Sequence, residues 1–291
     1  MDGPAAVEFQ GPPWPDELGV WLINLPRARD RREAVLARCQ SLGFMPQVVD
    51  GVDGPAEAKA LERVVDTPAF ERNVGRPVLW GGIGCYMSHL KVWQLFLESD
   101  KTVALVLEDD VILHGDFCTA VAQGLCARDH WDMLKLSRIR AKLPIRQGFI
   151  GPYSLNAYLG PFTGTAAYLI TRQTAARLLP LMVPVTRPTD HEIGRFFRHD
   201  FRLMGLEPFP SHPDTSCESL IAGKPGYSAW KFPRHRRLPS YALRLGNYLR
   251  RLRYLMAHGM LWPRQTQLLS PDAACVHATN MEAGNVPDRT A

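Results

Sequence analysis

The sequence predicts a mixed α/β fold in which a mostly parallel sheet has helices on both faces. One observation is a set of short apolar runs, each fit for a buried strand, at residues 19–25, 103–107 and 163–170. Another is that segments with apolar residues every three or four positions, typical of amphipathic helices, lie between these runs. Alternation of this kind favours parallel strands that are joined by helical crossovers.

The first elements are a strand, a helix and a second strand. Residues 19–25 predict a buried strand, and residues 26–42 predict a charged amphipathic helix, which a proline opens and a glycine ends. Residues 46–49 predict a short strand, and the Asp- and Gly-rich segment 50–54 marks the turn that follows it.

The middle of the chain continues the alternation. Residues 82–99 predict a helix that directly precedes the apolar run at 103–107. The elements expected after that run are a helix at 116–128, a strand at 131–136, an irregular basic stretch, a strand at 163–170 and a helix at 172–182.

Three carboxylates follow the apolar run at 103–107, namely Glu108, Asp109 and Asp110. Ligands of open α/β sheets bind at the carboxyl ends of the strands, so this position favours a functional site. Adjacent carboxylates repel one another in a half-buried cleft, and a hard cation that prefers oxygen ligands explains such a cluster most simply. The alternative is a strand that runs into an acidic, solvated turn.

The net charge of +5 is unevenly distributed along the 291 residues. Residues 224–271 contain ten Lys and Arg residues and no Asp or Glu, which leaves 24 basic and 29 acidic residues in the rest of the chain. Together with the predicted strands and helices, this division predicts an N-terminal arm (1–18), an α/β domain that carries the acidic cluster (19–223), a basic amphipathic helical segment (224–271) and a flexible tail (272–291).

The apolar residues of the basic segment lie three or four positions apart along one helical face, whereas most of its arginines lie elsewhere. Such a helix binds an anionic membrane surface or an acidic partner. The alternative is that its apolar face packs on the main domain. No nucleic-acid-binding motif accompanies the charge, so we expect no nucleic acid as a partner. The apolar positions are Tyr241, Leu245, Tyr248, Leu249, Leu252, Leu255 and Met256.

Hydropathy and cysteine spacing bear on the location of the protein. No run of about 18 apolar residues exists, and the first 17 residues lack a hydrophobic segment, so we expect neither a membrane-spanning helix nor a signal peptide. The six cysteines form no CxxC pair, which argues against a zinc site or a disulfide framework. These observations predict a cytoplasmic protein with reduced thiols.

Three segments carry a family resemblance: Trp-Leu-Ile-Asn-Leu-Pro at 21–26 with Arg-Asp-Arg-Arg at 29–32, Gly-Cys-Tyr-Met-Ser-His-Leu-Lys-Val-Trp at 84–93, and Leu-Val-Leu-Glu-Asp-Asp at 105–110. Together they closely resemble glycosyltransferase family 25, which includes bacterial lipooligosaccharide galactosyltransferases and the collagen galactosyltransferases. The likeness extends over residues 19–206, with 164–170 as a weaker fourth match. It implies a GT-A-like, Rossmann-like fold and an inverting transferase that usually uses UDP-galactose and commonly a divalent metal such as Mn²⁺ or Mg²⁺.

The resemblance assigns roles to the acidic cluster. Glu108 and Asp110 have the alternate spacing of the DxD motif of metal-dependent glycosyltransferases, with Glu in place of the first Asp. Asp110 is the expected direct metal ligand, while Glu108 or Asp109 contacts the metal through water or holds the ribose. His212 is a further candidate for the metal shell, although a loop histidine between prolines has simpler explanations.

Other residues are candidates for binding the UDP-sugar. Asn24 and Leu25 end the first strand at the edge where a nucleotide would bind, and Arg29 and Arg32 can contact phosphates in a bidentate manner. The alternative is a solvated helix face, which suits Arg31 better than these two.

Asp50 ends the second strand and is a candidate for the uridine or ribose, with a simple turn role as the alternative. The resemblance also places Ser88, His89 and Lys91 beside the donor, where they would contact the sugar or the diphosphate. A buried structural role is the alternative for His89.

Inversion by direct displacement needs a base that takes the proton of the acceptor hydroxyl. Asp190, at a predicted helix start about eighty residues after the acidic cluster, is the first candidate, and Glu192 is its rival. A capping role is the alternative for either acid.

The function expected from the sequence is transfer of a hexose, most simply galactose from UDP-galactose, to a saccharide or glycolipid acceptor such as a lipooligosaccharide core. The enzyme would act in the cytoplasm, peripherally on the inner face of the membrane. One alternative is a metal-dependent phosphoryl-transfer or phosphohydrolase enzyme, because a strand that ends in Asp-Asp also serves Mg²⁺ chemistry. Another is a non-catalytic scaffold that keeps a transferase fold.

Overall fold

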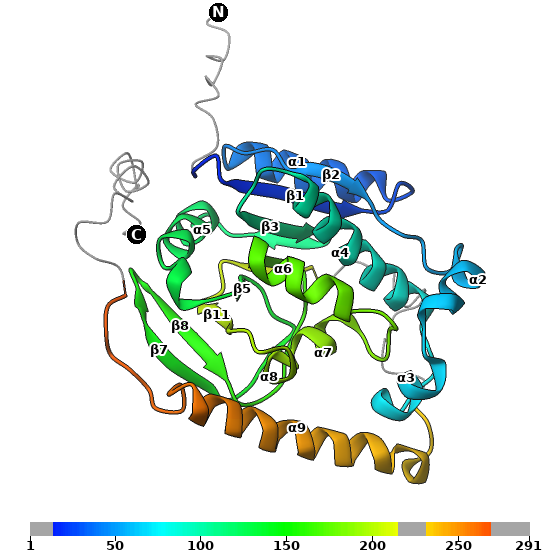
Figure 1. Ribbon diagram of the computed structural model, residues 1–291. Coiled ribbons are helices and arrows are strands. Elements are labelled where there is room, and N and C mark those ends of the chain that lie inside the picture. Colours follow the sequence, from blue (N-terminus) through cyan, green and yellow to red (C-terminus); the bar gives the residue numbers. More distant parts are fainter. Residues whose placement is uncertain (1–13, 215–230, 269–291) are drawn as a thin grey trace, which may run out of the picture.

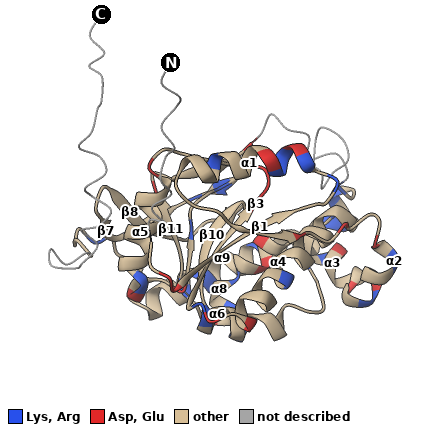
Figure 2. Ribbon diagram, turned by 90° about the horizontal axis from the view of Figure 1, so that it is seen from above, with Lys and Arg blue, Asp and Glu red and all other residues tan. Residues whose placement is uncertain are grey.

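The computed structural model describes residues 14–214 and 231–268. In this part of the chain an eight-stranded sheet has the order β2-β1-β3-β10-β5-β11-β8-β7. Helix α1 covers one face of the sheet, and α4 and α6 cover the other (Figure 1). Charged residues are concentrated on the helices and loops, whereas the central strands are mostly uncharged (Figure 2). The mixed α/β fold predicted from the sequence is confirmed.

Most strands of the sheet run in one direction. Strands β2, β1, β3, β5, β11 and β7 share it, and β10 and β8 run oppositely. The bounds are β1 (Leu18–Asn24), β2 (Gln47–Asp50), β3 (Val103–Glu108), β5 (Met133–Lys135), β7 (Pro144–Ile150), β8 (Tyr153–Tyr158), β10 (Ala167–Thr171) and β11 (Leu203–Glu207). Short strands form two small pairs, β4 (Val111–Leu113) with β12 (Ser211–Pro213) and β6 (Arg140–Ala141) with β9 (Phe162–Thr163).

The helices follow the sequence pattern closely, and the long helix predicted at residues 82–99 is α4. The bounds are α1 (Arg29–Ser41), α2 (Ala58–Leu61), α3 (Thr67–Val74), α4 (Trp80–Glu98), α5 (Phe117–Cys126), α6 (Arg172–Leu178), α7 (Thr189–Ile193), α8 (Phe196–His199) and α9 (Leu238–Ala257).

Strand β3 lies at the centre of the core, between β1 and β10. Its five apolar residues from Val103 to Leu107 are buried, because helices cover both faces of the sheet. Trp93 and Phe96 of α4 pack against the sheet and are fully buried. Burial of side chains of this size stabilises the fold by roughly 1.5–3 kcal/mol each. The core thus holds the end of β3, with its three carboxylates, in a fixed position.

Two local predictions differ from the structure. The segment predicted to be an irregular basic stretch contains the hairpin of β7 and β8, in which polar residues such as Arg146, Gln147 and Asn156 conceal the strand pattern. The thiols of Cys39, Cys85 and Cys118 are free, as expected, but Cys126 is in a disulfide, contrary to the prediction of reduced cysteines.

Helix α9 packs on the main domain through a face that the sequence pattern did not indicate. Its buried residues are Ser240, Arg251, Tyr254 and Leu255, of which only Leu255 belongs to the predicted apolar positions. The helix runs along the outside of the domain (Figure 1). In the described part of the chain no helix is long and apolar enough to span a bilayer. The predicted tail (272–291), and most of the predicted N-terminal arm, lie outside the described residues.

Candidate active site

The candidate active site is a cleft at the carboxyl ends of β1, β2 and β3. Parallel pairing places Ile23 beside Glu108 and Asn24 beside Asp50. Leu25 lines the cleft, and the first half of α4 forms its other wall. The enclosed space measures about 80 Å³, whereas small-molecule pockets usually measure roughly 300–1,000 Å³. It has room for a cation with a few oxygen ligands, so a larger ligand would extend along the sheet edge.

Glycines bring α4 close to the loop that follows β2. A Cβ on Gly84 would lie 2.5 Å from the backbone oxygen of Val52, and a Cβ on Gly54 would overlap the carbonyl group of Trp80. The Ser88 hydroxyl donates to the carbonyl oxygen of Gly84 (2.7 Å) and accepts from the N–H of Val52 (2.8 Å). Ser88 therefore fastens the loop to the helix and shapes the wall of the cleft.

A chain of buried side chains holds Glu108. Trp93 Nε1 donates to the Tyr168 hydroxyl (2.9 Å), which lies 3.0 Å from His89 Nδ1. Because the Glu108 carboxylate only accepts, the neutral His89 ring is assigned its proton on Nε2, and its Nδ1 then accepts from the Tyr168 hydroxyl. His89 Nε2 then donates to Glu108 Oε1 (3.1 Å), as does the hydroxyl of Thr165. Burial opposes ionisation of Glu108, but these bonds outweigh it and lower the pKa of this carboxyl.

Asp109 lies against β1 and α1. Asn24 Nδ2 donates to Asp109 Oδ2 (2.7 Å) and to the carbonyl oxygen of Ala28 (3.0 Å), and Arg31 Nη1 lies 3.7 Å from Asp109 Oδ1. Burial raises the pKa of Asp109, whereas Asn24 and Arg31 oppose the rise. Asn24 thus joins the acidic cluster to the segment that leads into α1.

Asp110 is the acid least satisfied by the protein. Its Oδ1 is buried and has no hydrogen-bond partner within residues 14–214 and 231–268. Burial, together with the negative charges of Glu108 and Asp109, raises the pKa of Asp110 to about 7. A buried carboxylate in this state is stabilised by a cation, and carboxylate oxygens suit Mg²⁺ or Mn²⁺.

The described residues contain one group of His, Cys and acidic side chains whose ligand atoms all lie within 4.8 Å, namely Cys85, His89 and Glu108. The oxygens of Glu108, Asp109 and Asp110 are spread more widely. A cation bound at Asp110 would therefore take one or two oxygens from the protein, as Mg²⁺ commonly does, and complete its shell with phosphate oxygens and water.

The arginines that reach the cleft are Arg27 and Arg31, which line it, whereas Arg29 and Arg32 do not. Arg27 pairs with Asp53 across the cleft entrance. The reason is helical phase: α1 begins at Arg29, and only Arg31 of its first turn reaches Asp109. The structure therefore brings Arg27 and Arg31 to the cleft in place of Arg29 and Arg32, whose phosphate contacts stay predictions.

Three predicted residues lie at the margin of the site. Lys91 Nζ donates to the backbone oxygen of Asp50 (2.8 Å), and both side chains are exposed. His212 lies on β12, next to the turn after β3, but its Nδ1 is 2.8 Å from Nε2 of His114. The metal-ligand role of His212 stays a prediction to which this contact gives no support.

Asp190 lies on the far side of the acidic cluster, at the start of α7. Its Oδ2 accepts from the backbone N–H of Gly164 (3.2 Å). Lys135, at the end of β5, is 1% exposed. Burial lowers the pKa of Lys135 to about 8, against the opposing charges of Asp190 and Glu108. The fold therefore brings the first candidate base and a buried lysine into electrostatic contact with the acidic cluster.

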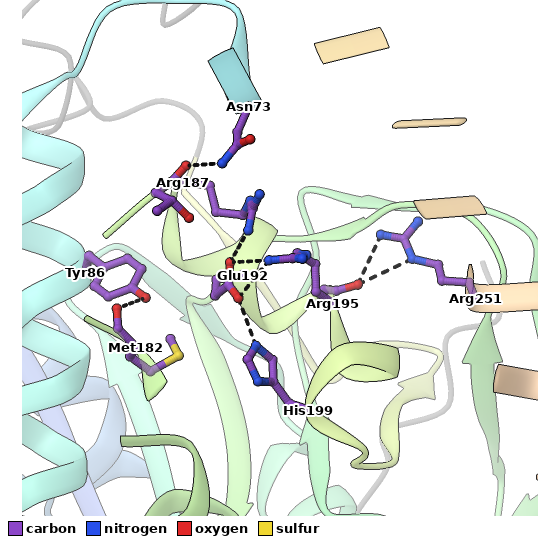
Figure 3. A network of polar contacts seen from close by, with 10 residues as sticks. Asn73, Tyr86, Met182, Arg187, Glu192, Arg195, His199 and Arg251 are labelled. Atoms are coloured by element: carbon purple, nitrogen blue, oxygen red, sulfur yellow. Dashed lines mark hydrogen bonds and ion pairs between the residues drawn. The ribbon is translucent and has the colours of Figure 1, made fainter. Parts of the chain in front are cut away.

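Glu192 has a different environment from Asp190, although both belong to α7. Its carboxylate accepts from Arg187 (2.6 Å), Arg195 (3.2 and 3.3 Å) and His199 (2.8 Å), as Figure 3 shows. Burial opposes ionisation of Glu192, but these partners lower its pKa to about 2. A carboxylate held so firmly is a poor proton acceptor, whereas the carboxylate of Asp190 has one backbone N–H as its hydrogen-bond partner among the described residues.

Besides Arg27 and Arg31, the site contains four residues that were not predicted from the sequence: Cys85, Lys135, Thr165 and Tyr168. Cys85, Thr165 and Tyr168 belong to segments that carry the family resemblance, which was the signal available for them. Lys135 lies within a strand that is otherwise apolar. A lysine inside a buried strand is rare enough to have been a signal.

Residues 18–193 match the model of the family described as Glycosyltransferase family 25 (LPS biosynthesis protein). This match confirms the resemblance inferred from the three sequence segments. It covers β1 to α7 and thus includes both the acidic cluster and Asp190.

Curated relatives give a consistent result. Procollagen galactosyltransferase 2 of Homo sapiens is 25% identical over 238 residues, which is 74% of this chain and 38% of the relative. Glycosyltransferase 25 family member of Aedes aegypti is 30% identical over 185 residues, 58% of this chain and 30% of the relative. Inactive glycosyltransferase 25 family member 3 of Homo sapiens is 27% identical over 224 residues, 68% of this chain and 38% of the relative. The chain thus spans less than half the length of these relatives.

Proposed function

The chain belongs to glycosyltransferase family 25, and from this premise we propose that it transfers a hexose, galactose from UDP-galactose, to a saccharide acceptor such as a lipooligosaccharide core. The observation that carries the proposal is the acidic cluster at the end of β3, where Asp110 Oδ1 is buried without a protein partner. Family membership indicates the class of reaction, which is glycosyl transfer. The acidic cluster supports the proposal that the site binds a cation and is active.

The donor would lie along the edge formed by β1 and β3. A divalent cation bound at Asp110 would neutralise the negative charge that develops on the departing diphosphate. Arg27 and Arg31 line the same cleft and are placed to contact phosphate oxygens. Asn24 and His89 act indirectly, because each fixes the position of one carboxylate of the cluster.

Asp190 would accept the proton of the acceptor hydroxyl as that oxygen attacks the anomeric carbon. The backbone N–H of Gly164 orients its carboxylate, and the charge of the buried Lys135 acts on it electrostatically. Glu192 would position α7 through its two arginines and its histidine rather than move a proton.

The proposed identities of the sugar donor and the acceptor are based on the names of the relatives and of the family. Several relatives are named as galactosyltransferases, which supports galactose as the sugar. The family description names LPS biosynthesis, which supports a bacterial glycan as the acceptor. The procollagen enzymes are more than twice as long as their match to this chain, so a protein acceptor has weaker support.

A location at the inner face of a membrane has support from α9. Residues Leu238, Tyr241, Leu245, Leu249 and Met256, called the apolar stripe below, are 40% to 64% exposed on this helix. An apolar stripe flanked by arginines is typical of helices that lie in the interface of an anionic bilayer. The disulfide at Cys126 opposes a cytoplasmic location, because disulfides are uncommon in reducing compartments. Cell fractionation of the tagged protein, with its redox state read by thiol labelling, decides between the two.

A transfer assay tests the proposed function. The purified chain is incubated with Mn²⁺, a saccharide acceptor and each of several UDP-sugars, and release of UDP is followed. We expect acceptor-dependent release with UDP-galactose, reduced about 10²-fold or more by Asp110→Asn. Asp100→Asn, at a carboxylate that is 86% exposed, is the matched control and should behave as wild type.

The alternatives predict different results in the same assay. Release of inorganic phosphate from simple phosphate esters, without UDP-sugar turnover, would indicate a phosphohydrolase instead. Relatives that are named inactive make a non-catalytic member of the family a specific second candidate. Complete absence of turnover, with UDP binding retained and the fold intact, would support that candidate.

A further inference from the structure

A second pocket lies between α8 and α9, away from the cleft at the strand ends. Its volume is about 580 Å³. The wall from the α8 side includes Arg195, Phe197 and Arg198, and the wall from α9 includes Arg250 and Arg253. Tyr254, Ala257 and His258 complete the lining. No carboxylate belongs to it, so the pocket is strongly basic.

The charges of this pocket are only partly compensated. Arg195 pairs with Glu192, and His258 lies 3.3 Å from Asp200. Arg198, Arg250 and Arg253 have no ion pair within residues 14–214 and 231–268. Like charges in one hollow repel each other, and an anion would relieve that repulsion.

Arg195, in the wall of the pocket, has a buried N–H donor without a hydrogen-bond partner in the described part of the chain. It is 7% exposed, and its Nε has no hydrogen-bond partner among the residues that the structure describes. Burial lowers the pKa of Arg195, Glu192 opposes this effect, and the cations of Arg187 and Arg198 add to it. The charged form of Arg195 is therefore destabilised by its burial and by neighbouring cations. A bound anion would reduce this destabilisation.

We propose that this pocket, called the basic pocket below, binds a phosphate monoester carried by a sugar or a lipid headgroup. Guanidinium groups recognise phosphate through paired N–H donors, and the exposed side chains of Arg198, Arg250 and Arg253 are available for such contacts. The volume exceeds what a phosphate alone needs. The rings of Phe197 and Tyr254 give the remaining space apolar walls that suit the carbon skeleton bearing the phosphate.

The position of the basic pocket suggests where such a phosphate would come from. Residues three and four positions apart are neighbours on a helix, so Arg253 lies next to Leu249 and Met256 of the apolar stripe. A bilayer that received the apolar stripe would thus present its headgroups at the mouth of the basic pocket. A soluble phosphorylated sugar is the other source of the same chemistry.

The basic pocket is also connected to the transferase site. Arg195 joins the pocket to Glu192 of α7, and Arg251 of α9 donates to the carbonyl oxygen of Gly194 (3.1 and 3.3 Å; Figure 3). Binding there would therefore fix α9 against the segment that carries Asp190. The phosphate site itself does not require the transfer reaction, so the two proposals stand or fall separately.

Calorimetric titration with inorganic phosphate, at constant ionic strength balanced with chloride, tests the basic pocket. The full chain should bind phosphate saturably, and the double variant Arg250→Gln/Arg253→Gln should bind it at least 10-fold more weakly. The matched control, Arg236→Gln/Arg244→Gln, removes the same charge outside the pocket and should bind as wild type. Asp110→Asn should also retain binding, which separates this result from failure of the transferase site.

No saturable binding by the wild type, or equal binding by the Arg250/Arg253 double variant, would overturn the proposal.

Two further experiments identify the source of the phosphate. Displacement of inorganic phosphate by glucose 6-phosphate alone indicates a soluble sugar. A lipid source is tested with two sets of phosphatidylcholine vesicles, which contain phosphatidic acid or the same charge as phosphatidylglycerol. Tighter binding to the phosphatidic acid vesicles indicates a lipid, provided that the double variant loses this preference. If vesicle binding follows charge alone and glucose 6-phosphate does not compete, the basic pocket is not a phosphate monoester site.

Discussion

Glu108, Asp109 and Asp110 are adjacent in the sequence, yet each has a different environment. Glu108 accepts hydrogen bonds from His89 and Thr165, Asp109 is bonded by Asn24, and Asp110 Oδ1 is left without a protein partner. The pKa is lowered for Glu108 and raised for the other two. Neighbouring groups, rather than residue type, therefore decide which acid is fixed as an anion and which is available to a cation.

Glu192 gives a pH-dependent prediction at this scale. Its pKa in the folded protein, about 2, lies below the ordinary value of 4.5, so its contribution to stability is present above about pH 4.5 and is lost as the pH falls toward 2. Glu192→Gln should lower the free energy of unfolding by about 3 kcal/mol at pH 7. The difference from wild type, measured by urea denaturation, should shrink between pH 4.5 and 3.

The exposed Glu62→Gln is the control for this variant and should leave the unfolding free energy unchanged. A difference between wild type and Glu192→Gln that stays constant from pH 7 to pH 3 would show that the negative charge of Glu192 is not the source of the stabilisation.

Several residues predicted from the sequence, among them Leu25, Ser88 and the acidic cluster, line the cleft, but the partners of these residues were not predictable. The position of the acidic cluster after a buried strand was predictable because β3 is uniformly apolar. That Arg31 rather than Arg29 or Arg32 faces Asp109 was not predictable, because a shift of one residue at the start of α1 turns a helix by about 100°. The chain from Trp93 through Tyr168 to His89 joins segments far apart in the sequence, and no local pattern reports such contacts.

At the scale of elements, α4 connects the core to the site. Its middle is buried against the sheet, its Gly84 and Ser88 hold the loop after β2, and its His89 reaches Glu108. At its C-terminal end Arg172 Nη1 donates to the carbonyl oxygens of Phe96 (3.1 Å), Ser99 (2.9 Å) and Lys101 (3.0 Å). Carbonyl groups at a helix end lack partners within the helix, so Arg172 serves as a cap supplied by another element.

Arg172→Met tests this cap, because methionine keeps an apolar stem and removes the donors. It should lower the free energy of unfolding by about 2 kcal/mol, the value of hydrogen bonds to a charged group. The exposed Arg177→Met on the same helix is the control and should change stability by less than about 0.5 kcal/mol. If both variants unfold at the same urea concentration as wild type, Arg172 does not stabilise the end of α4.

The order and type of most elements were predictable, whereas the partners of some strands were not. Helices α1 and α4 and strands β1 and β3 have strong periodic or apolar signals. The hairpin of β7 and β8 was missed because it lies at the edge of the sheet, where one face need not be apolar. The antiparallel direction of β10 follows from how the chain returns to β3, which local sequence does not encode.

At the scale of the whole molecule, the candidate site draws on distant segments. The acidic cluster comes from the end of β3, Arg27 and Arg31 come from the N-terminal region, and Asp190 comes from α7. The family match covers all of these segments. Helix α9 lies beyond the matched residues and carries the features that the sequence marked as unusual, namely its lack of acids and its exposed apolar stripe.

Helix α9 has one face that packs on the domain and another that is exposed. The sequence predicted a basic amphipathic helix at α9 but could not tell which face would pack. The structure uses Ser240, Arg251, Tyr254 and Leu255 for packing and leaves the apolar stripe exposed. Choice of the packing face depends on the shape of the domain surface, which only the assembled fold provides.

The acidic cluster is expected to bind a cation which in turn holds the diphosphate of the donor. Calorimetric titration of the full chain with UDP, with and without Mn²⁺, measures this most directly. We expect UDP binding that strengthens at least about 10-fold with Mn²⁺ in the wild type and in Asp100→Asn, and no such gain in Asp110→Asn. Binding of UDP with equal affinity with and without Mn²⁺, unchanged by Asp110→Asn, would contradict it.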